Sequence, residues 1–131
     1  MAMMFDHISI GVADLARSRA FYDAALAPLG YGRIRDFDDA VGYGEPLPAR
    51  NGHFWIARPE NGRPAPMPGL HLAFRAPNRV AVDAVHAAAL AAGGRDNGAP
   101  GLRPHYHPNY YGAYVLDPDG HHVEVVCHDA A

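Results

Sequence analysis

The stretch FDHISIGVADLARSRAFYDAALAPLG, residues 5–30, combines two periodicities in a fixed order. Apolar residues alternate with polar or small residues over Phe5–Val12, which predicts a strand with one buried face. Asp14 stands where a helix N-cap belongs, and Leu15–Leu29 places its apolar residues on one helical face. Gly30 is suited to end that helix. The stretch therefore predicts a strand followed by a helix that covers one face of a sheet.

The same pattern returns in the second half of the chain. Leu70–Ala76 alternates like a strand, and Arg79–Ala92 is an alanine-rich helical segment that ends at a glycine pair. A shift of 64 positions superposes the first histidines, the helix caps and the terminal glycines: His7 on His71, Asp14 on Asn78 and Gly30 on Gly94. Each half is therefore predicted to repeat one structural unit.

The remaining segments complete the two units. Strands are expected at Tyr31–Phe37, Ala40–Tyr43, His53–Arg58, Tyr110–Leu116 and His122–Cys127, with a tight turn at Asp117–Gly120 and a long loop from Gly93 to Asn109. The proline-rich segment Pro59–Gly69 suits neither a helix nor a central strand. We predict an α+β fold in which two β-α-β-β-β modules form a cleft. The modules span about residues 4–59 and 69–128 of a single domain, 1–131, and are joined by a linker at 60–68.

Composition excludes several classes of partner. The 131 residues carry a formal net charge of -3, which offers no basic face for nucleic acid. No stretch approaches the 18 apolar residues of a membrane span, and the N-terminus lacks the features of a secretory signal. The single cysteine, Cys127, cannot form an internal disulfide. We therefore expect a cytoplasmic protein that binds neither nucleic acid nor membrane.

Alternation along three strands places one potential metal ligand of each on the face that the helices leave open. These ligands are His7, His71 and Glu124. Two imidazoles and a carboxylate suit a divalent metal that keeps open positions for water or substrate. A histidine on a strand is also often an ordinary polar-face residue, so the pattern alone leaves both readings open.

The chain resembles the vicinal oxygen chelate superfamily, the glyoxalase/bleomycin resistance/dioxygenase group. The matching motifs are DHISIGVADLARSRAFYDAAL, GLHLAF and YVLDPDGHHVEVV, in order along nearly the whole chain. The resemblance implies paired β-α-β-β-β modules, a homodimer and a small-molecule substrate. It also implies a divalent metal (Zn, Ni, Mn, Co or Fe) held by a histidine on the first strand, a histidine on the fifth and a glutamate on the eighth. Those positions correspond to His7, His71 and Glu124.

One departure from glyoxalase I bears on the reaction. Glyoxalase I adds a Glu or Gln from its fourth strand, and His53–Arg58 of this chain holds neither. The length of the chain and the set of three metal ligands favour lyase, isomerase or transferase chemistry on an oxygenated substrate that is chelated by the metal. Two alternatives stay open: a metal-free binding protein of the bleomycin resistance type with an aromatic cleft, and a small extradiol-type dioxygenase.

Further side chains are candidates for substrate contacts. Tyr110 and Tyr114 share one strand face, and Tyr114 is a candidate phenol donor, although strand aromatics also simply fill space. His105 and His107 lie between prolines in the preceding loop, where they suit a general base or a lid, or else a solvated loop or dimer contact. Cys127 falls on the packed face, which argues against a nucleophile.

Overall fold

The strands of the computed structural model, which describes residues 4–45 and 53–131, form two four-stranded sheets. The first sheet has the order β1-β4-β3-β2 and the second the order β5-β8-β7-β6. The strands of the first are β1 (Ile8–Gly11), β2 (Gly32–Asp36), β3 (Ala40–Gly44) and β4 (Phe54–Ala57). Those of the second are β5 (His71–Arg75), β6 (Arg95–Leu102), β7 (Tyr111–Leu116) and β8 (His122–Cys127).

One helix accompanies each sheet, as the repeat predicts. Helix α1 (Leu15–Leu26) continues into a short 3-10 turn, η1 (Ala27–Leu29), and α2 (Arg79–Ala91) occupies the equivalent place in the second half. The predicted caps are confirmed: the Asp14 carboxylate accepts from the Arg17 amide at 3.1 Å, and the Asn78 side chain accepts from the Ala81 amide at 2.8 Å. The α+β fold with two β-α-β-β-β modules is therefore confirmed.

The first strand of each module pairs in parallel with the last strand of the same module: β1 with β4, and β5 with β8. Ser9 of β1 lies opposite Trp55 of β4, and Ala73 of β5 lies opposite Glu124 of β8. Because side chains alternate across a strand, these residues lie on the face opposite to buried neighbours such as Phe54. Each sheet thus has one face toward its helix and one outer face.

The segment from Gly93 to Asn109 is predicted as a loop, and this is wrong for its first half, which forms β6. The strand carries Pro100 and register shifts around Gly98, where φ is +152°. Since β6 pairs only with β7, it lies at a sheet edge, where bulges and proline are tolerated. The glycine, proline and asparagine residues of β6 are typical of loops, so the sequence pattern does not indicate a strand here.

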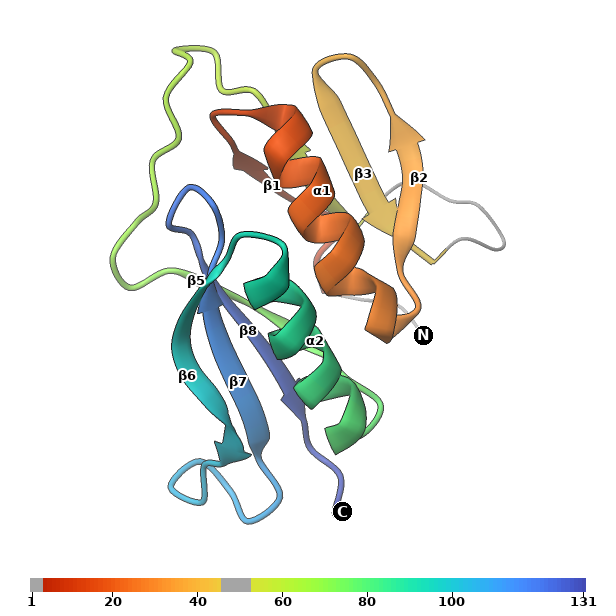
Figure 1. Cartoon of the computed structure of the whole chain (residues 1–131), viewed down its shortest axis with the longest axis vertical. Helices are drawn as coiled ribbons and strands as arrows, with labels where there is room; N and C mark the ends of the chain where they lie inside the picture. The colour runs from red at the N-terminus through yellow and green to blue at the C-terminus, as the bar shows by residue number, and fades with distance from the viewer. Residues whose placement is uncertain (1–3, 46–52) are drawn as a thin grey trace.

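The two modules contact each other through their helices (Figure 1), which run side by side. Core residues from both halves form one cluster, and Ala89 of α2 and Val123 of β8 belong to the same cluster as Phe54. The Phe54 and Phe74 rings meet edge to face at 5.3 Å between centroids. This shared core lies on the helix side, so the outer face of each sheet is turned away from it. None of the helices in the described ranges is long and apolar enough to cross a membrane.

Candidate metal centre

His71 and Glu124 form a pair on the outer face of the second sheet. The Nε2 atom of His71 lies 3.1 Å from Oε1 of Glu124, because β5 and β8 are paired neighbours. The Glu124 side chain is only 2% exposed, whereas the His71 side chain is 52% exposed. A buried carboxylate therefore stands beside an imidazole that solvent or a ligand can reach.

Tyrosines surround the second oxygen of this carboxylate. The hydroxyl of Tyr110 donates to Oε2 of Glu124, and Tyr114 lies opposite Glu124 in the β7–β8 ladder. Burial, and then the hydrogen bond to Glu124, raises the pKa of Tyr110 well above that of a free phenol. Burial, followed by the charge of Glu124, raises the pKa of Tyr114 to about 12. Both phenols therefore stay protonated at neutral pH, and Tyr110 donates its proton in a hydrogen bond to Glu124.

The His71–Glu124 pair lines a hollow of about 430 Å³ on the second module. Its walls combine three phenols, two imidazoles, an amide and the carboxylate: Tyr106, Tyr110, Tyr114, His71, His122, Asn97 and Glu124. Among the residues predicted from the sequence, His71, Tyr114 and Glu124 are thus brought together. A cavity of this size with a few convergent polar groups is typical of a small-molecule site.

His7 does not join this pair within one chain. Its side chain is 53% exposed, and its Nδ1 atom lies 2.6 Å from Oδ1 of Asp6. Within residues 4–45 and 53–131, only one set of three or more potential ligands has its atoms within 4.8 Å of one another, and it contains neither His7 nor Glu124. Of the three predicted ligands, His71 and Glu124 are therefore in contact on the second module, and His7 lies on the first module.

The predicted loop histidines lie beside the hollow and outside its lining. The Nε2 atom of His107 is 2.8 Å from Nδ1 of His128, and the His105 ring packs on Tyr106 at 4.2 Å between centroids. Tyr106, between the two histidines, lines the hollow together with Tyr110. Sequence reading did not single out Tyr106, because nothing in its spacing distinguishes it from its neighbours.

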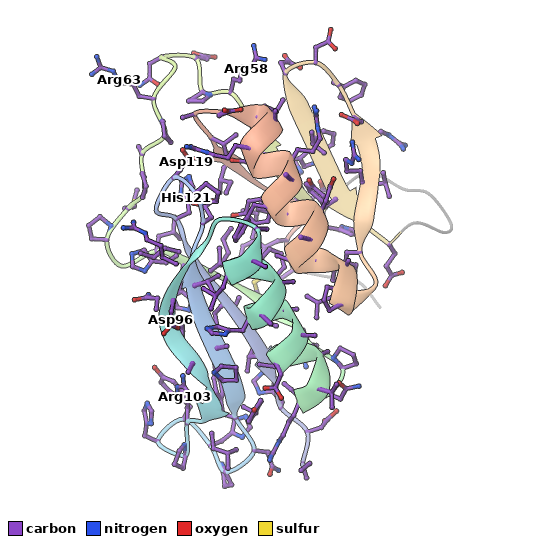
Figure 2. The ribbon with its side chains drawn as sticks, in the orientation of Figure 1. Arg58, Arg63, Asp96, Arg103, Asp119 and His121 are labelled. Carbon is purple, nitrogen blue, oxygen red and sulfur yellow. The ribbon has the colours of Figure 1, made fainter. Side chains whose placement is uncertain are left out.

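A second group with metal-binding potential lies at the β7–β8 turn: Asp117, Asp119 and His121. Figure 2 shows Asp119 and His121 at this turn, close to the start of α1. Their ligand atoms lie within 4.8 Å of one another, a spacing that suits a cation. The sequence predicts only a tight turn here.

Hydrogen bonds already engage the atoms of this second group. Tyr22 donates its hydroxyl to Asp117 at 2.7 Å, Arg17 donates to Asp119 at 2.8 Å, and the His121 ring lies 2.7 Å from the carbonyl oxygen of Gly11. The partners Tyr22, Arg17 and Gly11 all belong to the first module, so the turn fastens the two modules to each other. Because these hydrogen bonds already engage the polar atoms of Asp117, Asp119 and His121, we assign the three residues a structural role.

Comparison with known proteins agrees with the fold. The model of the Glyoxalase/Bleomycin resistance protein/Dioxygenase superfamily matches residues 4–125. The crystal structure of a glyoxalase/bleomycin resistance protein from Albidiferax ferrireducens T118 is 36% identical, with a TM-score of 0.84 over 97% of this chain and 100% of that one. This chain belongs to that superfamily. No curated protein matches it.

More distant structures share the fold. A glyoxalase-related enzyme from Fulvimarina pelagi is 23% identical, with a TM-score of 0.73 over 96% of this chain and 88% of that one. A glyoxalase I variant from Zea mays is 24% identical, with a TM-score of 0.72 over 93% of this chain and 45% of that one. Several neighbours are thus described as glyoxalase-family enzymes.

The structural role of the β7–β8 turn predicts a loss of stability on Asp117→Asn. The new amide group would face the Tyr22 hydroxyl or the amides of Asp119 and His121, which donate to the carboxylate. We expect the free energy of unfolding to fall by about 1–3 kcal/mol, the cost of leaving buried donors without an acceptor. Urea unfolding measures this, with the exposed Asp38→Asn as control. An unchanged midpoint for Asp117→Asn would contradict the structural role.

Proposed function

We propose that this protein is a metal-dependent member of its superfamily that binds a small oxygenated substrate through a divalent metal. The observation that carries the proposal is the buried carboxylate of Glu124, which lies 3.1 Å from the half-exposed imidazole of His71 in a hollow lined by phenols. His7 is the third proposed ligand, and it comes from a second copy of the chain.

The donor atoms suit a divalent metal. Two ligands bound at about 2.0–2.2 Å in octahedral or tetrahedral geometry lie about 2.8–3.6 Å apart, a range that contains the 3.1 Å between the His71 and Glu124 atoms. Imidazole with carboxylate is a donor set shared by Zn, Ni, Mn, Co and Fe sites. Three protein ligands leave positions free for two adjacent substrate oxygens. The hollow therefore provides two of the three proposed ligands and the space for a substrate.

The chain's own residues would bind and orient the substrate. A bound divalent ion supplies Lewis-acid polarisation of a substrate oxygen. Tyr114 donates a hydrogen bond from its phenol to a substrate oxygen, since its pKa of about 12 keeps the proton in place at neutral pH. Asn97 and His122 line the same hollow and offer further polar contacts. Lyase, isomerase or transferase chemistry is consistent with this set of donors.

A homodimer completes the proposed site. His7 directly precedes β1 of the first sheet, and the His71–Glu124 pair lies on the outer face of the second sheet, which is turned away from the shared core of the chain. A two-fold pairing that sets the first module of one copy against the second module of the other brings the pair to the partner subunit's His7. It also covers exposed apolar side chains such as Phe5 and Leu70, which are 63% and 51% exposed.

The dimer makes a simple prediction for solution mass. Two chains of 14.1 kDa should scatter light as one particle of about 28 kDa over a wide range of protein concentration, because closed two-fold pairing satisfies both outer faces at once. A particle with the mass of one chain over that range would contradict the shared site.

The second candidate function is metal-free binding of an aromatic ligand. The Phe37 and Trp55 rings are parallel within 2°, with centroids 6.3 Å apart. A Cβ at Gly42 would approach the Trp55 ring to 2.9 Å, so the glycine makes room for the indole. This flat aromatic surface suits a planar ligand, and it favours the binding-protein alternative if the protein takes up no metal.

Glu124→Gln tests the proposed metal site directly. The substitution keeps the size of the side chain and removes the negative charge, so we expect metal affinity to fall by at least about 10-fold. Isothermal titration of untagged protein with Zn²⁺ and Co²⁺ measures the affinity, and Glu60→Gln in the linker is the matched control. Equal affinity of Glu124→Gln and the wild type would contradict the assignment.

The protein should show weak glyoxalase I activity or none. Glyoxalase I needs a base close to the metal that moves a proton between adjacent carbons, and β4 with its flanks, His53–Arg58, provides no acidic residue. The assay uses the hemithioacetal of methylglyoxal and glutathione with protein loaded separately with Zn²⁺, Ni²⁺, Co²⁺ or Mn²⁺. Turnover of about 1–1000 per second with any of these metals would show that another residue supplies the base.

A further inference from the structure

The ring of Tyr110 is enclosed by three other rings. Tyr106 lies 4.8 Å away between centroids, His107 lies 5.4 Å away and His128 lies 5.3 Å away, and both histidines are nearly perpendicular to Tyr110. These contacts come from the β6–β7 loop and from the residue that follows β8. The Tyr110 ring is therefore contacted by residues that precede β7 and by the residue that follows β8.

The two histidines of this enclosure are themselves held in place. The amide of Asn109 donates to Nδ1 of His107 at 3.1 Å, so the neutral His107 carries its proton on Nε2. That proton is donated to Nδ1 of His128, 2.8 Å away. The pair thus has a defined hydrogen-bond direction and fixes the orientation of both rings against Tyr110.

Glu124 is consequently restrained at both of its oxygens. Oε2 accepts from the Tyr110 hydroxyl, and Oε1 faces Nε2 of His71 at 3.1 Å. The backbone is also close: a Cβ at Gly112 would lie 3.4 Å from Oε2. Both oxygens of the carboxylate are therefore engaged by neighbouring side chains.

We infer that Tyr110 is a positioning residue that engages Oε2 of Glu124, so that the carboxylate offers Oε1 alone to a metal. The inference rests on the proposed metal site, and it concerns how the ligand is presented. A carboxylate with both oxygens free can bind a metal through two atoms and occupy a position that the substrate needs. A carboxylate with one oxygen bonded to a phenol binds through one atom and leaves that position open.

Tyr110→Phe tests this inference, because it removes one hydroxyl and keeps the enclosed ring. Tyr111→Phe is the matched control: Tyr111 is the next residue, and its hydroxyl donates to Asp83 at 2.7 Å on the other side of the strand. Each protein is titrated with Co²⁺, and both the dissociation constant and the visible absorption of the bound Co²⁺ are recorded. The absorption reports the number and geometry of the ligands.

We expect Tyr110→Phe to bind Co²⁺ about 10–100-fold more weakly, with an altered visible spectrum, the usual cost of removing a hydrogen bond to a metal ligand. Tyr111→Phe should match the wild type in both. If the wild type binds Co²⁺ and Tyr110→Phe binds it equally with the same spectrum, the inference is overturned and the metal site stands. If the wild type binds no Co²⁺, the metal site and the inference fall together.

A second variant covers the case in which Tyr110→Phe does not fold. His107→Leu keeps the phenol and removes one side of its enclosure, so we expect a smaller loss of Co²⁺ affinity and a spectrum shifted in the same direction. His107→Leu with the affinity and spectrum of the wild type would overturn the role of the enclosure in holding Tyr110.

Discussion

The buried charge of Glu124 is the constraint around which the second module is organised. Removing a carboxylate from water costs several kcal/mol unless other groups satisfy it. Here His71 and Tyr110 contact one oxygen each: the pairing of β5 with β8 brings His71 to Glu124, and Tyr110 reaches Glu124 from the residue before β7. A binding hollow with a fixed acceptor at its base follows from this arrangement.

The hairpin of β7 and β8 carries two separate functions. Its turn, with Asp117 and Asp119, is fastened to Tyr22 and Arg17 of the first module. Farther along β8, Glu124 faces the hollow. Because one short hairpin carries both, the position of the first module is linked mechanically to the strand that presents the carboxylate. The helices cover the opposite face of the sheets (Figure 1), and the hollow lies on the face that they leave open.

Local patterns predicted much of this architecture. The caps Asp14 and Asn78 mark the helices, and period-two alternation places His71 and Glu124 on one face. β6 was missed because an edge strand tolerates the glycine and proline that normally indicate a loop.

The other features are set by contacts between distant residues. Alternation places Tyr110 on the same face as Tyr114, but the hydrogen bond of Tyr110 to Glu124 is a contact between residues 14 positions apart that spacing does not encode. The anchoring of Asp117 by Tyr22 joins residues 95 positions apart. The location of His7 relative to the other two proposed ligands depends on how copies of the chain pair, which one sequence does not specify.

The most direct test of the shared site uses two inactivating variants in one dimer. A heterodimer of a His7→Ala chain and a Glu124→Gln chain places both defects in one shared site and leaves the other intact, whereas sites formed within single chains would each carry one defect. With differently tagged chains purified as the heterodimer, our account predicts about one tightly bound Co²⁺ per heterodimer and none in either variant homodimer. A heterodimer without tightly bound Co²⁺, alongside a wild-type dimer that binds it, would contradict the account.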